Sequence, residues 1–270
     1  MSDLSNPDYL LTDQYKDSSN LNARLQLHER FSINQYGWHP WVFDQLNLPP
    51  VCRILELGCG LGALWLKNSE RIPAGWDITL SDFSSGILQD VQRNLSICKH
   101  PFHYEQVNAQ SIPFPNESFD VVIANHMLYH VPSREKAYSE VTRVLVPGGL
   151  FYAAANGYDH LKELADLGRR FDQAAYEAGL EIDAGVISDK FTLEDGQEEL
   201  SRWFSSVTLQ RFEDGLIVTK LDPLLDWATS WAKPVFGDRF EDFKQFLVKE
   251  FTSKNEIRVT KDAGILEARK

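Results

Sequence analysis

The stretch Ile54-Leu55-Glu56-Leu57-Gly58-Cys59-Gly60-Leu61-Gly62 decides the fold of this chain. Its first part is largely apolar and predicts a buried strand, which runs directly into a glycine-rich turn and then into a helix. Glycines let the backbone of such a turn approach a ligand closely, and the free N–H groups at the start of the helix favour polar or anionic atoms. The stretch therefore predicts a strand, a ligand-binding turn and a helix.

Short apolar runs alternate with helical patterns downstream of this stretch. Ser133 can cap a helix that Pro147-Gly148-Gly149 ends. Parallel strands need crossover connections, and strands separated by helices meet that requirement. The alternation predicts βαβ units with strands at 52–57, 77–82, 102–107, 119–124 and 150–155, and further helices at 63–69 and 84–97.

The pattern changes after residue 155. It predicts a helix at 159–179, a short helix capped by Thr192, a strand at 207–212, a helix capped by Asp222, an aromatic-rich helix over 240–251 and closing strands at 257–260 and 264–269. We expect an α/β fold with a doubly wound, mostly parallel seven-stranded sheet whose last strand is antiparallel. The expected division is a helical N-terminal extension or lid at 1–50, a cofactor-binding core at 51–155, and the last strands with an inserted helical cover at 156–270.

The composition disfavours some classes of partner. Acidic residues outnumber basic ones by 39 to 27, and the formal charge of -12 repels polyanions, so we expect no nucleic-acid partner. Cys52, Cys59 and Cys98 have neither metal-ligand nor disulfide spacing, which predicts no metal site and a reducing compartment. The N-terminus has no secretory leader pattern, and no apolar stretch has the length of a membrane span, so we expect a cytoplasmic protein without a membrane partner.

Asp82 is the second candidate for ligand binding. It ends the next expected strand, 20 residues beyond Gly62, where a carboxylate can accept hydrogen bonds from the ribose hydroxyls of an adenosine. Gly58, Gly60 and Ala63 also satisfy the dinucleotide fingerprint. An NAD-dependent oxidoreductase is therefore an alternative that the turn and the acid leave open.

Over residues 51–155 the chain resembles the class I S-adenosylmethionine-dependent methyltransferases, especially the small-molecule subgroup of UbiE-like enzymes (methyltransferase type 11). The resemblance implies a Rossmann-like core, an enzyme, S-adenosylmethionine as cofactor and a small-molecule methyl acceptor. A catalytically silent protein that binds S-adenosylmethionine is a further alternative. The pieces that carry the resemblance occur in order as Glu56-Leu57-Gly58-Cys59-Gly60-Leu61-Gly62, Asp82, Asn108-Ala109-Gln110-Ser111-Ile112-Pro113-Phe114-Pro115, Phe119-Asp120-Val121-Val122 and Arg143-Val144-Leu145-Val146-Pro147-Gly148-Gly149.

The resemblance also implies which residues bind the cofactor. The glycine turn would hold its amino-acid end, Asp82 its ribose and Phe83 one face of its adenine. The family often has Asp where this chain has Asn108, so the amide oxygen must accept the hydrogen bond from the adenine amino group. The full cofactor-binding set is Glu56, Gly58, Cys59, Gly60, Gly62, Asp82, Phe83, Asn108, Ala109, Gln110, Asn125 and His126.

Methyl transfer is an in-line displacement that requires no nucleophilic residue of the protein, because holding the reactants in line supplies much of the rate. A base matters only where the acceptor must lose a proton, and His126 and His130 are the candidates by location. For each histidine, a structural or cofactor-orienting role is the preferred interpretation. In the family, N-terminal extensions often fold over the cofactor, which would place Arg24 or Tyr15 near its carboxylate; a solvated helix face is the preferred alternative.

Overall fold

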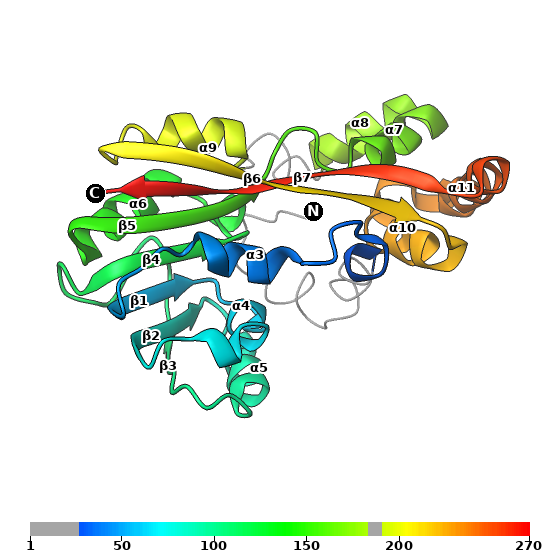
Figure 1. The fold of residues 1–270 in the computed structure, drawn as a ribbon. Helices are drawn as coiled ribbons and strands as arrows, with labels where there is room; N and C mark the ends of the chain where they lie inside the picture. The colour runs from blue at the N-terminus through cyan, green and yellow to red at the C-terminus, as the bar shows by residue number, and fades with distance from the viewer. Residues whose placement is uncertain (1–26, 183–190) are drawn as a thin grey trace. The chain divides into compact units, whose positions relative to one another are not determined.

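A seven-stranded sheet is the centre of the fold, with the strand order β3-β2-β1-β4-β5-β7-β6 (Figure 1). The computed structural model describes residues 27–182 and 191–270. The pairs β1–β2, β1–β4, β2–β3 and β4–β5 are parallel, and β7 is antiparallel to β5. These pairings confirm the predicted fold class. The strands are β1 Val51–Leu57, β2 Gly75–Asp82, β3 His103–Gln106, β4 Phe119–Asn125, β5 Leu145–Asn156, β6 Ser206–Val218 and β7 Ile257–Arg269.

Local hydrogen bonds fix where several helices begin. Ser84, Ser133 and Thr192 each accept a hydrogen bond from a backbone N–H of the first turn, as capping residues do. The helices are α3 Trp38–Gln45, α4 Ala63–Leu66, α5 Ser85–Leu95, α6 Arg134–Val144, α7 Lys162–Phe171, α8 Gln173–Ile182, α9 Leu193–Leu200, α10 Leu221–Phe236 and α11 Phe240–Lys254, with 3-10 turns η2 Ser69–Arg71, η3 Leu128–His130 and η4 Gly237–Arg239.

The chain divides into two compact units. One contains the described residues within Met1–Gln35, Asp159–Lys190 and Glu213–Asp262, and the other contains Tyr36–Tyr158, Phe191–Phe212 and Ala263–Lys270. We call them unit 1 and unit 2. Because β6 and β7 each cross a boundary, both strands contribute residues to both units.

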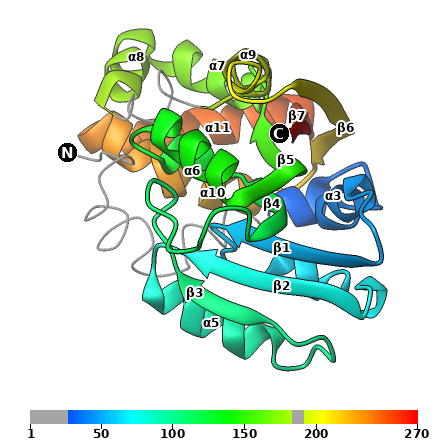
Figure 2. The ribbon, with the colours of Figure 1, turned by 90° about the vertical axis from the view of Figure 1, so that its left-hand side faces the viewer.

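Unit 2 has helices on both faces of its strands (Figure 1 and Figure 2). One face packs α6 and α9 against the sheet, through buried residues such as Val141 and Leu193. The other face packs α3, α4 and α5, through residues such as Phe43, Trp65 and Val91. Burial of both faces explains why β1 and β4 are almost continuously apolar.

Unit 1 has its own hydrophobic core. Residues of α7, α8, α10 and α11 pack with the parts of β6 and β7 that belong to this unit. Aromatic rings form much of the core, with ring centroids 4.6 Å apart for Phe236 and Phe243 and 5.2 Å apart for Phe171 and Phe236. Among the described residues of the chain, no helix is both long and apolar enough to cross a bilayer.

The predicted start of β5 was wrong. Pro147-Gly148-Gly149 does not end the preceding helix, because α6 already stops at Val144 and β5 begins at Leu145. The pairing with β4 shifts at this point: Phe119 pairs with Leu145, but Val121 pairs with Leu150. Residues 146–149 therefore bulge opposite Asp120, and a bulge tolerates a proline inside a strand.

Other boundaries differ from the predicted ones in the second half of the chain. The expected helix at 159–179 is two helices, since Asp172 is extended and its side chain accepts a hydrogen bond from the N–H of Ala175. Asp222 lies inside α10, whose N-cap is Lys220. The predicted strand at 207–212 is part of a longer strand, β6, and the two predicted closing strands form a single strand, β7.

Residues 27–31 are helical. The predicted helix start at Asn20 lies outside the described residues, and so do Tyr15 and Arg24.

Gly62 and Gly148 form a matched pair for testing the glycine turn. Both have a φ of +76°, but a Cβ on Gly62 would lie 2.6 Å from Cγ2 of Val91, whereas a Cβ on Gly148 would meet nothing within 4 Å. Gly148→Ala is expected to lower the free energy of unfolding by about 1 kcal/mol through backbone strain alone. Gly62→Ala is expected to cost a further 1–3 kcal/mol, roughly, through overpacking. Urea denaturation of both variants measures the difference, and equal costs would contradict a packing role for Gly62.

Candidate functional site

The sequence-predicted site residues come together at one edge of unit 2. In the sheet, β1 lies between β2 and β4, and Leu57 pairs with both Ser81 and Ala124. Gly58, Asp82 and Asn125 therefore follow the same level of three neighbouring strands. The chain extends the sheet outward from β1 to β3 and then returns to the other side of β1, and ligands bind at such a switch point in doubly wound folds.

The three glycines of the turn serve different purposes. All have positive φ values of +66° at Gly58, +53° at Gly60 and +76° at Gly62. A Cβ at Gly58 would lie 2.8 Å from Cβ of Met127, so this glycine allows the turn to pack against the loop after β4. A Cβ at Gly60 would meet nothing within 4 Å. The main chain is therefore bare and open at Gly60, where a ligand can approach it.

Asp82 joins the glycine turn to the end of β2. Its Oδ2 accepts a hydrogen bond from the N–H of Gly60 at 3.3 Å, and its Oδ1 accepts one from the N–H of Ser84 at 3.0 Å. Burial raises the pKa of the Asp82 carboxyl, while these backbone donors oppose the shift. The neighbouring Phe83 leaves 40% of its surface exposed, and its carbonyl accepts a hydrogen bond from Nε2 of Gln106. A carboxylate and an exposed aromatic ring thus lie side by side in the sequence at the sheet edge.

Glu56 lies beneath the site and is only 2% exposed. Its Oε2 accepts a hydrogen bond from Nε1 of Trp65 at 2.5 Å, and its Oε1 accepts one from Nδ2 of Asn125 at 3.2 Å. Burial raises the pKa of Glu56 to about 7, and the two donors offset part of that effect. Because the amide nitrogen of Asn125 donates to Glu56, the amide oxygen is directed elsewhere. That oxygen is buried and, within residues 27–182 and 191–270, has no hydrogen-bond partner.

The segment 108–110 forms a turn beside the end of β3. Oδ1 of Asn108 accepts a hydrogen bond from the N–H of Gln110 at 2.9 Å, while the residue itself is exposed. Ala109 is buried, and Oε1 of Gln110 accepts a hydrogen bond from the N–H of Ser133 at 3.1 Å. The side chain of Gln110 therefore holds the start of α6. The amide oxygen of Asn108 also accepts a longer hydrogen bond, at 3.4 Å, from Nε2 of Gln110.

The two candidate histidines have different surroundings. His126 has a φ of +50°, which is rare for a residue with a Cβ, and such strain occurs preferentially at functional sites. Its N–H donates to the carbonyl of Ala154, and its ring lies 5.1 Å from that of Trp38. His130 ends η3, and its ring lies 4.4 Å from that of Tyr129. His126 thus directly follows Asn125 at the sheet edge, and His130 lies one turn further.

The contacts of Trp65 and Trp38 with residues of the site were not predicted from the sequence. Trp65 is fully buried in α4 and donates to Glu56, while Trp38 belongs to α3 and contacts His126. A glutamate inside an apolar strand needs a buried donor, which is the signal that could have directed the search to Trp65. No comparable signal in the sequence connects Trp38 to a residue so far along the chain.

Cys59 is not a reactive thiol. It is 7% exposed, and burial raises its pKa, so the thiolate is disfavoured. It packs in the core of unit 2 as a small apolar residue. Among the described residues, no group of three or more His, Cys, Asp or Glu side chains is arranged to hold a metal ion.

Comparison with protein families and curated proteins agrees with this geometry. A family described as "Methyltransferase domain" matches residues 55–153. The ubiquinone/menaquinone biosynthesis C-methyltransferase UbiE of Vibrio parahaemolyticus is 35% identical over 115 residues, which cover 42% of this chain and 44% of that protein. The UbiE of Pectobacterium atrosepticum is 29% identical over 140 residues, covering 51% and 54%. The chain thus spans about half the length of these relatives or less.

Solved structures share the fold at low sequence identity. The YcgJ protein of Bacillus subtilis superposes with a TM-score of 0.57 at 16% identity, covering 86% of this chain and 97% of that one. Phosphoethanolamine N-methyltransferase 2 of Haemonchus contortus, solved with S-adenosylhomocysteine, gives a TM-score of 0.59 at 16% identity, covering 97% and 59%. Residues 55–153 of this chain are therefore similar to a methyltransferase domain, and the solved structures show a shared fold.

Proposed function

We propose that this protein binds S-adenosylmethionine at the edge formed by β1, β2 and β4 and transfers its methyl group to a small-molecule acceptor. One observation carries the proposal. Within the region that matches the methyltransferase family, three groups lie just beyond or at the ends of three adjacent strands: a bare main chain at Gly60, a carboxylate at Asp82, and a buried amide oxygen at Asn125 that has no hydrogen-bond partner among the described residues. An adenosyl amino acid has a complementary group for each of them.

The groups of the cofactor fit the polar atoms of this edge. The remaining lone pairs of the Asp82 carboxylate can accept hydrogen bonds from the ribose hydroxyls, and the exposed ring of Phe83 offers a surface for the adenine. The Asn125 oxygen would accept a hydrogen bond from the ammonium of the amino-acid end, which would satisfy an otherwise costly buried acceptor. The adenine amino group would donate to the Asn108 oxygen in place of Nε2 of Gln110, whose hydrogen bond to that oxygen is long at 3.4 Å.

The amide of Asn125 needs an orienting partner, because its oxygen and nitrogen are nearly the same size. Glu56 supplies one, since its carboxylate, once ionised above a pH of about 7, can only accept and therefore fixes the Nδ2 side of the amide. Trp65 holds Glu56 from the other side. Glu56 is thus a positioning residue that acts through Asn125.

The chain's own contribution to the reaction is binding and orientation. Bound S-adenosylmethionine supplies an electrophilic methyl group, and an acceptor atom held in line with it needs no covalent help from the protein. Where the acceptor must lose a proton, His126 or His130 would accept it. The strained backbone of His126 and its contact with Trp38 restrict where its ring can lie. A cytoplasmic location stays a prediction.

Titration calorimetry tests the proposal against its two alternatives. The wild-type protein is expected to bind S-adenosylhomocysteine and to give no heat with NAD. Binding of NAD without S-adenosylhomocysteine would instead indicate an oxidoreductase. The second measurement follows transfer of label from methyl-labelled S-adenosylmethionine to a panel of small molecules carrying oxygen, nitrogen, carbon or sulfur nucleophiles. Binding without any transfer across this panel would favour a silent cofactor-binding protein.

A further inference from the structure

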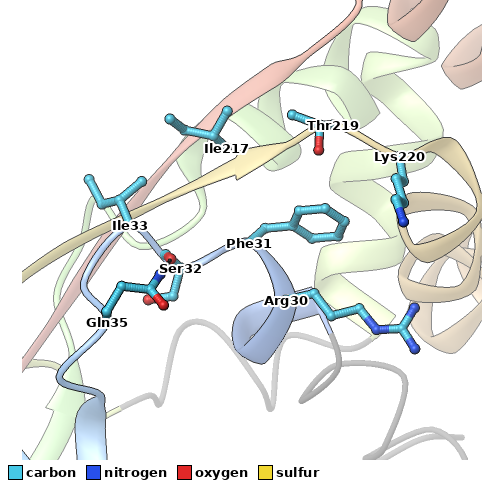
Figure 3. A pocket seen from close by; sticks show the side chains of 8 residues that line it. All are labelled: Arg30, Phe31, Ser32, Ile33, Gln35, Ile217, Thr219 and Lys220. Carbon is cyan, nitrogen blue, oxygen red and sulfur yellow. Dashed lines mark hydrogen bonds between the residues drawn. The ribbon is translucent and has the colours of Figure 1, made fainter.

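A cavity of about 700 Å³ lies within unit 1, apart from the residues of the proposed cofactor site (Figure 3). Residues of the segment 30–35 form one side of it, and residues 217–220 at the end of β6 form the other. The side chains of Phe31, Ile33 and Ile217 give it apolar surface, and Ile33 is 57% exposed. Arg30 and Lys220 contribute positive charge, and Figure 3 shows their charged ends on the same side of the cavity.

Arg30 is exceptional among the arginines that the structure describes. Each of the others has a carboxylate, carbonyl or aromatic partner, even at exposed positions such as Arg93 and Arg202. Arg30 has none of these within residues 27–182 and 191–270, and Lys220 likewise has no carboxylate partner there. The chain carries 39 acidic residues against 27 basic ones, so partners are abundant. The partners of the other arginines are an ion pair at Arg53, Arg71, Arg93, Arg134, Arg143, Arg170, Arg202, Arg211, Arg239 and Arg258, the ring of Tyr176 at Arg169 and the carbonyl of Gly148 at Arg269.

A second cavity of unit 1 provides the contrast. It measures about 770 Å³ and also contains basic residues, including Arg170, Lys254 and Arg258. Those charges are neutralised locally, because Arg170 and Lys254 pair with Glu250 and Arg258 pairs with Glu256. An anion entering the second cavity would have to break these pairs. The first cavity presents its charges without that cost.

The polar side chains that line the first cavity differ in whether they are free to bind a ligand. The hydroxyl of Ser32 donates to Oδ2 of Asp214 at 2.5 Å, and Asp214 is further paired with Lys261, so neither group can serve a ligand. The hydroxyl of Thr219 points toward the ring of Phe31 in Figure 3. Guanidinium and ammonium groups bind carboxylates and phosphates through charge-assisted hydrogen bonds, and Arg does so with two parallel bonds.

We infer that this cavity binds a small amphiphilic anion, whose carboxylate or phosphate pairs with Arg30 and Lys220 while its apolar part covers Phe31, Ile33 and Ile217. The apolar surface alone would take any hydrophobic molecule, and the charges alone would take any anion. Their combination in one cavity selects a molecule that has both features. The inference concerns unit 1 and does not depend on methyl transfer.

Four probes separate the two features. Hexyl phosphate and hexanoate carry an anion on an alkyl chain, hexanol has the chain alone, and inorganic phosphate has the anion alone. In calorimetric titrations, the wild-type protein is expected to bind hexyl phosphate or hexanoate at least about tenfold more tightly than hexanol and inorganic phosphate. Added sodium chloride should weaken the binding, since the cations are exposed. The better of the two anionic probes identifies the head group.

The double variant Arg30→Gln/Lys220→Gln is expected to lose at least about tenfold in affinity for the anionic probe. The control, Arg93→Gln/Lys99→Gln, removes the same charge from exposed residues of unit 2 and should bind as the wild type does. Circular dichroism verifies that both variants fold. Absence of saturable binding by the wild type, equal affinity for hexanol, equal affinity for inorganic phosphate, or an unchanged affinity in the double variant would each overturn the inference.

Discussion

Replacement of Asp82 by alanine is expected to weaken the binding of S-adenosylhomocysteine by about 100-fold or more. The variant would lose the charge-assisted hydrogen bonds that the carboxylate accepts from the ribose hydroxyls, each of which contributes roughly 1.5–3 kcal/mol. The same substitution removes the acceptor that holds the N–H of Gly60, so the bare main chain of the turn would lose its support. Calorimetry with S-adenosylhomocysteine and with 5′-methylthioadenosine measures the effect, and both ligands should be affected because both contain the ribose.

Asp77→Ala is the matched control for this variant. Asp77 belongs to the same strand, but its side chain is 63% exposed and lies 3.2 Å from His103, away from the glycine turn. This control should bind both ligands as the wild type does. Undiminished affinity in folded Asp82→Ala protein would refute the proposed ribose contact.

Replacement of Glu56 by glutamine is expected to weaken the binding of the amino-acid end of the cofactor while leaving the binding of its adenosine part nearly unchanged. A glutamine can still accept the hydrogen bond from Trp65, but its amide nitrogen would then face Asn125 and favour a reversed Asn125 amide. The nitrogen of Asn125 would replace its oxygen in the site. We expect about tenfold weaker binding of S-adenosylhomocysteine, and little change for 5′-methylthioadenosine, which has no amino acid.

The outcome for the two ligands distinguishes positioning from general damage. Equal losses would mean that Glu56 supports the fold of the site rather than the orientation of Asn125. Asn125→Asp offers a second readout, because its carboxylate would repel Glu56 and present an oxygen in either orientation. If neither variant discriminates between the ligands, the proposed role of Asn125 is wrong, while the ribose contact of Asp82 is unaffected.

The pKa of Glu56 also predicts a pH dependence of stability. Burial raises this pKa to about 7, so the folded protein keeps the proton in a range where the unfolded chain has already released it. The free energy of unfolding should therefore fall as pH rises from about 4.5 to about 7, by roughly 3 kcal/mol from this group. Glu56→Gln removes the titrating carboxyl and with it this contribution to the pH dependence of the free energy of unfolding. Between pH 5 and pH 8, urea denaturation should show the variant gaining stability relative to the wild type.

The strands and the glycine turn could be predicted from the sequence because both are local patterns. The strands β1 to β4 lie within about two residues of their predicted positions, β5 begins at Leu145 instead of Leu150, and the caps at Ser133 and Thr192 are confirmed. The family resemblance is confirmed by the match over residues 55–153. The roles of the individual site residues stay predictions, to be decided by the variants described here.

The errors arose where tertiary pairing overrides local preference. Pro147-Gly148-Gly149 is a strong helix stop in isolation, but β4 pairs with Leu145 before this segment and with Leu150 after it, which draws the segment into a bulged strand. Asp172 breaks the predicted long helix by capping α8, a role that a helical period cannot reveal. The Glu56, Trp65 and Asn125 network joins three elements, and only the folded chain brings them together.

The place of β7 in the sheet has a consequence for biosynthesis. Among the described strands, β6 has β7 as its single neighbour in the sheet, and β7 follows β6 in the chain only after α10 and α11. Although domains generally begin folding on the ribosome from the N-terminus, β6 must wait until β7 has been synthesised before it can join the sheet. A nascent polypeptide arrested before residue 257 would expose an unpaired β-edge, which is the kind of surface that chaperones and aggregation compete for.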